Sequence, residues 1–198
     1  MDPRAEFFDQ QANTWEEQCY PAPVRARLAS LVESFHLRPG TQVLDMGTGT
    51  GILHPYLLEA VGTIGRIAVC DLSFQMLKEA RKKPYAPQIL CFQASAMELP
   101  LPSGSFDQVI CFAAFPHFAH KLRAMQEMAR VTKTGGELVI AHLLSREGLL
   151  QHHKTHPAVA QDCLPEADDM RRLFREAGFT TPDIRNEPGL YFASAVKR

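Results

Sequence analysis

The sequence predicts an α/β fold with a sheet of seven mostly parallel strands and helices on both of its faces. Short apolar segments alternate with segments of helical spacing, which is the pattern of parallel strands joined by helices. A glycine-rich turn joins the first strand to a helix, and a tight turn joins the last two strands. With 198 residues the chain is most simply one domain, residues 1–198.

Composition excludes several classes of protein. A formal net charge of −1, with no basic stripe interleaved with aromatics, argues against a nucleic-acid partner. No apolar run approaches the roughly 20 residues that span a bilayer. The N-terminus is charged from residue 2, and five scattered cysteines without a C-x-x-C pair indicate a reducing compartment. We expect a cytoplasmic protein without a membrane span; the sequence does not indicate an oligomeric state.

Residues 43–51, VLDMGTGTG, give the clearest indication of a ligand-binding site in the sequence. An apolar strand ends at Asp45, and alternate glycines lead into a helical segment at 52–61. Such a turn lets backbone N–H groups and a helix N-terminus approach a ligand, although a tight turn without a ligand is the alternative. Counted from Gly49, the dinucleotide fingerprint G-x-G-x-x-G would need glycine at position 54, where His54 stands.

The pattern D-x-G-x-G-x-G resembles motif I of the class I S-adenosylmethionine (SAM) dependent methyltransferases, which have a Rossmann-like fold. LPLPSGSFDQV and RVTKTGGELVI also resemble segments of this family, most of all the small-molecule enzymes of ubiquinone and menaquinone biosynthesis. The resemblance implies SAM as the cofactor, with Asp45 near its ammonium group. The turn that packs against the methionine part of SAM comprises Gly47, Thr48, Gly49 and Gly51.

The first 20 residues carry aromatic side chains on an otherwise polar segment, and 24–35 show helical spacing. They resemble the N-terminal lead-in of the same methyltransferases, which folds over the cofactor and acceptor as a lid. We therefore interpret residues 1–35 as a helical lid and Tyr20 as a substrate contact. An amphipathic helix that packs on the core through its aromatics fits the same pattern.

The second predicted strand, 66–70, ends at Asp71, 20 residues after Gly51. A carboxylate at the carboxyl end of a strand next to the first can accept hydrogen bonds from both ribose hydroxyls. The resemblance assigns Asp71 to the ribose of SAM and places Leu72 near the adenosine. Alternatively, Asp71 only caps the helix predicted at 74–82.

The third and fourth strands are predicted at 88–93 and 106–112. Between them, Ser95 stands where the family usually has an acidic residue that receives the adenine amino group. A serine hydroxyl can accept the same hydrogen bond without charge assistance, or Ser95 is a plain loop residue. By the resemblance, Ala96 and Met97 also contact adenine, and we assign Phe112 to the cofactor site.

The segment AAFPHFAH follows the fourth strand, at the sheet edge where ligands gather in such folds. His117 is the candidate catalytic residue, because an imidazole can accept a proton near neutral pH. A structural role is the alternative, since many methyltransferases need no base. Phe115 is assigned to the wall of the acceptor pocket.

A turn at 134–136 is predicted to lead into the fifth strand, 137–144. The histidine-rich insert that follows, 146–164, is not explained by the family pattern. His152 and His156 are four residues apart, so one helix face could present both to a metal, with Cys163 or Asp162 completing the site. In the family this insertion commonly covers the acceptor, which makes His152 and His156 candidate substrate contacts instead. A polar connector is the third interpretation. A metal could bind here but is not expected.

The end of the chain reads as a helix at 165–178 and two strands at 183–186 and 190–196, joined as an antiparallel hairpin. Methyltransferases of this class end their sheet with such a reversed seventh strand, which nicotinamide-binding sheets lack. The hairpin and His54 therefore both disfavour a nicotinamide-dependent oxidoreductase.

The predicted function is transfer of a methyl group from SAM to a small-molecule acceptor by in-line displacement. The alternative is a non-catalytic protein that binds SAM or S-adenosylhomocysteine, or a metal-responsive protein that uses the His152 and His156 insert.

Overall fold

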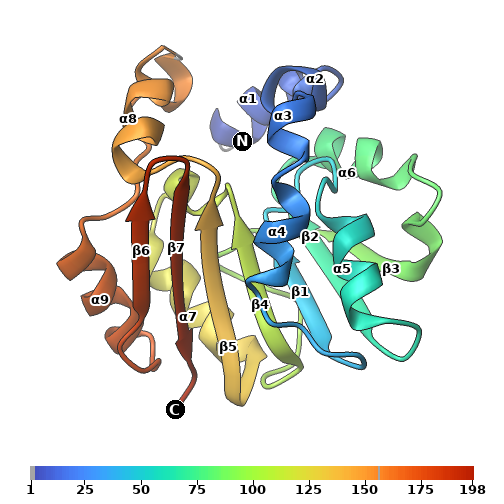
Figure 1. Ribbon diagram of the computed structural model, residues 1–198, viewed down its shortest axis with the longest axis vertical. Helices are drawn as coiled ribbons and strands as arrows, with labels where there is room; N and C mark the ends of the chain where they lie inside the picture. Colours follow the sequence, from blue (N-terminus) through green and yellow to red (C-terminus); the bar gives the residue numbers. More distant parts are fainter. Residues whose placement is uncertain (1–2, 156) are drawn as a thin grey trace. The chain divides into compact units, whose positions relative to one another are not determined.

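The computed structural model describes residues 3–155 and 157–198 (Figure 1). The chain forms two compact units, residues 1–94 and 95–198. Each is described by itself below, and the single domain expected over 1–198 stays a prediction. Among the described residues, no helix is both long and apolar enough to span a membrane.

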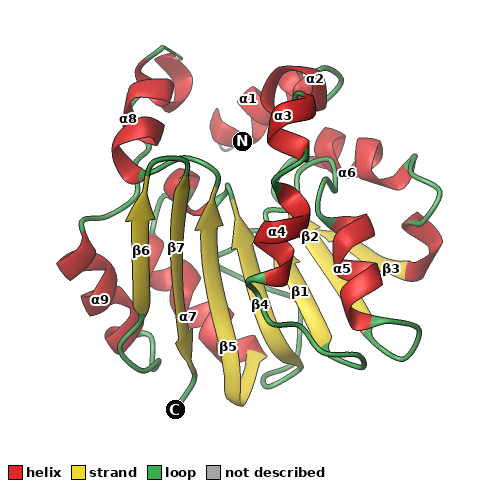
Figure 2. Ribbon diagram, in the orientation of Figure 1, coloured by secondary structure: helices red, strands yellow, loops and turns green. Residues whose placement is uncertain are grey.

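The first unit contains three parallel strands with their connecting helices (Figure 2). Its strands are β1 (Gln42–Met46), β2 (Arg66–Asp71) and β3 (Ile89–Gln93). Its helices are α1 (Pro3–Gln11), α2 (Trp15–Cys19), α3 (Ala22–Arg25), α4 (Leu28–Glu33), α5 (His54–Val61), α6 (Phe74–Arg81) and the 3-10 helix η1 (Ala86–Gln88).

In this unit the polar ends of β1 and β2 come together. Both strands are parallel and in register, with Asp45 opposite Val69, so their carboxyl ends lie at the same edge of the sheet. The middle of β1 is apolar and fully buried at Val43 and Leu44, which explains why these residues form a central strand. The residues that follow β1 and β2 therefore extend from a rigid part of the sheet.

The second unit contains four strands, and the last two form a closing hairpin. Its strands are β4 (Phe106–Phe112), β5 (Thr132–His142), β6 (Asp183–Glu187) and β7 (Leu190–Val196). Its helices are α7 (Lys121–Val131), α8 (Arg146–Lys154), α9 (Ala167–Glu176) and the 3-10 helices η2 (Phe115–His117) and η3 (Pro157–Val159). Strand β7 is antiparallel to both β5 and β6, whereas β4 and β5 are parallel.

The fold class predicted from the sequence is confirmed. The sheet has seven strands in the order β3-β2-β1-β4-β5-β7-β6, and the seventh is reversed. One boundary differs, because β5 begins at Thr132 and not after the predicted turn at 134–136. Thr132 pairs with Phe106 and Glu137 with Gln108, so residues 133–136 bulge out of the ladder at Gly135, where φ is 80°.

Candidate functional site

The glycine turn of the first unit adopts a backbone that only glycine adopts readily. Gly47, Gly49 and Gly51 have φ of 73°, 56° and 78°. The N–H groups of Gly47 and Thr48 donate to the carbonyl of Cys70, at 2.9 and 3.1 Å, which ties the turn to β2. A Cβ at Gly51 would lie 2.4 Å from the His54 ring. The glycines therefore let the chain turn closely over a buried side chain.

Asp71 is held by two backbone donors at the end of β2. Gly49 N–H donates to Oδ2 and Ser73 N–H to Oδ1, each at 2.8 Å. Burial raises the pKa of Asp71 to about 6, although the surrounding N–H donors offset part of that rise. The helix-cap alternative for Asp71 is wrong, because the Ser73 hydroxyl caps α6 by accepting from Met76 N–H at 3.1 Å. Each Asp71 oxygen keeps a lone pair for a further donor.

Asp45 ends a buried chain of hydrogen bonds. The Thr48 hydroxyl donates to Asp45 Oδ2 at 2.6 Å, so its oxygen accepts from His54 Nε2 at 2.7 Å. Asp45 is only 2% exposed, and burial raises the pKa of its carboxyl to about 7, with the charge of Asp71 adding to the rise. Burial lowers the pKa of His54 to about 4. His54 is therefore neutral near pH 7 and offers Asp45 no compensating charge.

The N-terminal helices are anchored to the same turn by two carboxylates. Asp9 on α1 accepts from the Ser73 hydroxyl at 2.5 Å and from Gln75 N–H at 3.1 Å. Glu16 on α2 accepts from the Thr50 hydroxyl at 2.8 Å and forms ion pairs with Lys83 and Arg25. The aromatic-rich segment is thus tied to the glycine turn by polar contacts. Its role as a lid stays a prediction.

Tyr20 lies just after α2 and is buried. Its backbone carbonyl accepts from Arg25 Nε at 2.7 Å. Burial raises the pKa of the Tyr20 hydroxyl well above its usual range, and the charges of Asp45 and Glu16 add to this. The hydroxyl is therefore uncharged near these two carboxylates, and its contact with a substrate stays a prediction.

Four carboxylates lie around this turn, and their negative charge favours cationic ligands over anionic ones. They are Asp9, Glu16, Asp45 and Asp71. Of these, Asp45 and Asp71 are held by hydrogen-bond donors that carry no charge. Such a surface attracts a cationic group and repels the phosphates of a dinucleotide.

In the second unit, residues 95–98 form a tight turn. Ser95 Oγ accepts from Met97 N–H at 3.2 Å, and Ser95 O accepts from Glu98 N–H at 3.1 Å. The Ser95 hydroxyl thus shapes the loop, as the plain-loop interpretation expects. The predicted adenine contacts of Ser95, Ala96 and Met97 remain predictions.

Two histidines contact Asp162, one at its buried carboxylate and one at its backbone oxygen. His117 Nδ1 lies 2.8 Å from Asp162 Oδ2, and His153 Nδ1 lies 2.6 Å from the backbone oxygen of Asp162. The rings of His117 and His153 are 4.9 Å apart between centroids. The Asp162 side chain is 5% exposed and that of His117 is 12% exposed. The sequence-predicted catalytic histidine is therefore paired with a carboxylate 45 residues away.

His142, at the end of β5, belongs to the same group of imidazoles. Its Nδ1 accepts from Leu144 N–H at 3.1 Å, and its ring lies 6.4 Å from that of Phe112. Burial lowers the pKa of His142, and positive charge on His117, His153 or His152 would lower it further. His142 is therefore neutral near pH 7.

The other predicted residues of this unit have different surroundings. Phe115 is fully buried and packs edge to face on Phe118, with 5.7 Å between ring centroids. His152 is exposed on α8, while its neighbour His153 is the buried histidine. His156 lies outside the described residues. Within residues 3–155 and 157–198, no group of three or more histidine, cysteine, aspartate or glutamate side chains could hold a metal ion, and Cys163 is a free thiol.

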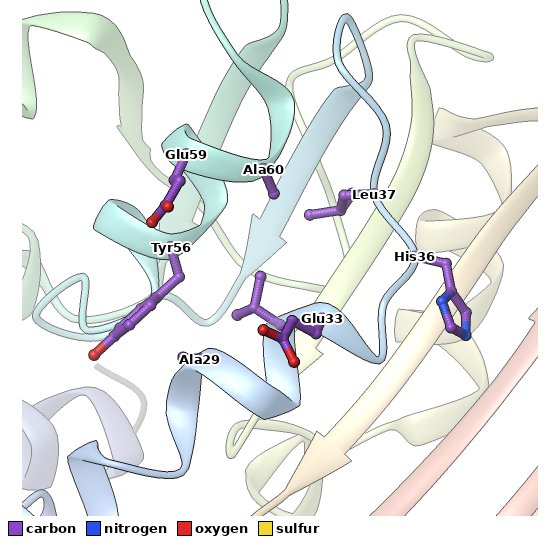
Figure 3. A pocket seen from close by; sticks show the side chains of 8 residues that line it. Ala29, Glu33, His36, Leu37, Tyr56, Glu59 and Ala60 are labelled. Carbon is purple, nitrogen blue, oxygen red and sulfur yellow. The ribbon is translucent and has the colours of Figure 1, made fainter.

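A separate pocket of about 590 Å³ lies between α4 and α5 in the first unit (Figure 3). It is lined by Ala29, Val32, Glu33, His36, Leu37, Tyr56, Glu59 and Ala60. None of these residues belongs to the glycine turn or to the carboxylates around it. The pocket therefore adds nothing to the candidate site.

Comparison with known proteins agrees with this geometry. Residues 44–140 match the model of the methyltransferase domain family. A ubiquinone/menaquinone biosynthesis C-methyltransferase of Ectopseudomonas mendocina is 35% identical over 113 residues, 55% of this chain and 44% of the relative. A demethylmenaquinone methyltransferase of Lysinibacillus sphaericus is 40% identical over 105 residues, which are 52% of this chain and 44% of the relative. A SAM-dependent methyltransferase structure from Aquifex aeolicus superposes with a TM-score of 0.76 over 100% of both chains at 20% identity, which shows the fold.

Residues 44–140 of the chain thus match the methyltransferase domain family, and the relatives and the solved structure described above are methyltransferases. The cofactor of this family is SAM, as the glycine motif predicts. The chain spans about half the length of the curated relatives it matches.

Sequence reasoning missed the contacts that join distant segments of the chain. Glu16 meets Thr50 across 34 positions and Asp9 meets Ser73 across 64, and neither pair leaves a local pattern. His54 was noted only because it is not glycine. Its position three residues after Gly51, near the start of the helical segment, was the available signal of a buried partner for the motif.

Proposed function

We propose that this chain transfers a methyl group from SAM to a small-molecule acceptor. The observation that carries the proposal is Asp71, whose two oxygens are fixed by Gly49 N–H and Ser73 N–H beside the glycine turn. A carboxylate oriented in this way suits the two hydroxyls of a ribose. Asp45 suits the ammonium group of the methionine part, because its side chain is buried and the nearby His54 is neutral and does not offset its charge.

The chemistry is a displacement at carbon. A lone pair on the acceptor attacks the methyl carbon while the carbon–sulfur bond breaks, and its electrons return to sulfur, which leaves S-adenosylhomocysteine. The protein contributes alignment and exclusion of water. The names of the relatives support a small, quinone-related acceptor.

The proposal predicts turnover with a simple quinol. The protein is incubated with SAM that carries a deuterated methyl group and with 1,4-dihydroxynaphthalene, and products are followed by mass spectrometry. We expect one labelled methyl in the naphthalene product for each S-adenosylhomocysteine formed. Product no greater than with heat-denatured protein would contradict the proposed transfer.

A further inference from the structure

Two backbone N–H groups orient the Asp71 carboxylate, and the N-terminal helices restrain the residues at or next to both of them. Ser73 N–H donates to Asp71 Oδ1 and Gly49 N–H donates to Oδ2, each at 2.8 Å. Ser73 is fully buried, and its hydroxyl donates to Asp9 of α1 at 2.5 Å. All of these residues belong to the first unit. Helix α1 therefore reaches one of the two donors to Asp71 through a single hydrogen bond.

Asp9 restrains Ser73 by acting as a second cap on α6. The Asp9 oxygen that accepts from the Ser73 hydroxyl also accepts from Gln75 N–H, at 3.1 Å. The Ser73 oxygen itself accepts from Met76 N–H at 3.1 Å, so its proton is directed at Asp9. The hydroxyl is thus held on both sides. These contacts restrain the backbone that carries the Ser73 N–H.

Glu16 restrains the other donor from α2. Its Oε1 accepts from the Thr50 hydroxyl at 2.8 Å and pairs with the Lys83 ammonium, while its Oε2 lies 3.2 Å from Arg25 Nη2. Burial acts to raise the pKa of Glu16, but the hydrogen bonds from Lys83 and Thr50 outweigh it and hold the pKa below its usual value. Gly49 precedes Thr50 with a φ of 56°, and glycine changes its backbone angles more freely than other residues. A tie on Thr50 therefore restricts the direction of the Gly49 N–H.

Trp15, the first residue of α2, adds an apolar contact at the same glycine. A Cβ on Gly49 would lie 3.9 Å from the indole nitrogen of Trp15. The indole also packs edge to face on Phe8 of α1, with 5.6 Å between ring centroids. Both helices therefore lie against the glycine turn through side chains that contact each other.

We propose that Asp9 and Glu16 are positioning residues for cofactor binding. They act through Ser73 and Thr50, which hold the two N–H donors of Asp71 in place. The carboxylate is thereby kept in the orientation that accepts both ribose hydroxyls. The inference rests on the proposed function and extends it to α1 and α2, whose carboxylates raise the affinity for the nucleoside without contacting it.

The test measures binding of 5′-methylthioadenosine, an uncharged nucleoside that contains the ribose, by calorimetry. Because this ligand has no net charge, removal of a carboxylate changes its affinity little through charge alone. Asp9→Ala and Glu16→Ala should each weaken binding by about 2–12-fold, which corresponds to the net contribution of one hydrogen bond. Asp9→Asn and Glu16→Gln keep an accepting oxygen and should restore most of the affinity.

Thr50→Val tests the contact of α2 from the side of the turn. Valine has nearly the shape of threonine but cannot donate to Glu16, which keeps its ion pairs with Lys83 and Arg25. The variant should weaken nucleoside binding by the same factor as Glu16→Ala. Unchanged binding by Thr50→Val would show that the Glu16 contact does not position the turn.

A double-mutant cycle with Asp71→Ala separates positioning from general support of the fold. If the two carboxylates act through Asp71, Asp9→Ala and Glu16→Ala should change affinity by less than about twofold in the Asp71→Ala background. An equal loss of affinity in both backgrounds would overturn the inference. Glu6→Ala and Glu17→Ala are the matched controls, exposed carboxylates on the same two helices, and should bind the nucleoside as the intact protein does.

Amide hydrogen exchange gives a second measurement that needs no ligand. The N–H groups of Gly49 and Ser73 should exchange faster in Glu16→Ala and Asp9→Ala, respectively, than in the intact protein. Unchanged exchange, or nucleoside binding as tight in the alanine variants as in the intact protein, would overturn this inference and leave the proposed function standing. An intact protein that binds neither SAM nor 5′-methylthioadenosine would overturn both.

Discussion

Asp71→Ala is expected to weaken SAM binding by at least about a hundredfold. A hydrogen bond to a charged group contributes about 1.5–3 kcal/mol, and the proposed ribose contact contains two. The substitution also removes the acceptor of Gly49 N–H, so the glycine turn loses one of its hydrogen bonds to β2, while those to the Cys70 carbonyl remain. Calorimetric titration of the variant with SAM measures the loss.

A truncated ligand makes the Asp71 prediction specific to ribose. 5′-Methylthioadenosine has the ribose but lacks the amino-acid part, so Asp71→Ala should weaken both ligands by similar factors. The isosteric Asp71→Asn should retain one accepting oxygen and lose less affinity than the alanine variant. Unchanged binding of 5′-methylthioadenosine by Asp71→Ala would show that this carboxylate does not hold the ribose.

Asp45→Asn is expected to make the protein more stable and SAM binding weaker. The folded state raises the pKa of this carboxyl from 3.8 to about 7. The folded state therefore binds the proton more tightly than the unfolded chain, and the stability associated with Asp45 is lost as pH rises from about 4 through 7. Each pKa unit corresponds to about 1.4 kcal/mol. Removal of the charge should raise the free energy of unfolding by about 2–4 kcal/mol at pH 8, and by less at pH 5.

The effect of Asp45→Asn on ligands should be opposite to its effect on stability. SAM has an ammonium group and should bind the variant more weakly, whereas 5′-methylthioadenosine has none and should bind it unchanged. In the intact protein SAM affinity should also fall as pH decreases below about 7, because Asp45 becomes protonated. Urea unfolding at the two pH values, with Asp168→Asn as the exposed control, measures stability. A less stable Asp45→Asn variant at pH 8 would contradict the account.

The fold was predictable because its signals are local. The apolar strand before Asp45, the alternate glycines and the hairpin around Gly189 each lie within a few residues, and each fixes one element. The positive φ of the three motif glycines follows from the same residues. A turn was expected at 134–136, but residues 133–136 instead form a bulge within β5. The bulge depends on the pairing of β5 with β4, which is not a local signal in the sequence.

The candidate site was predictable only in part, because its partners are far apart in sequence. His117 was chosen from its position after a strand, but its partner Asp162 is 45 residues away. The spacing of His152 and His156 gave no signal for His153, which is the buried histidine of α8. Pairing of such groups depends on tertiary packing, which a sequence pattern does not encode.

The central claim is that the glycine turn and its carboxylates bind SAM in preference to a dinucleotide. Calorimetric titration of the intact protein with SAM and, separately, with NADH tests it most directly. The account predicts saturable binding of SAM and no measurable binding of NADH, because phosphates would face Asp45 and Asp71. Binding of NADH without binding of SAM by folded protein would contradict it.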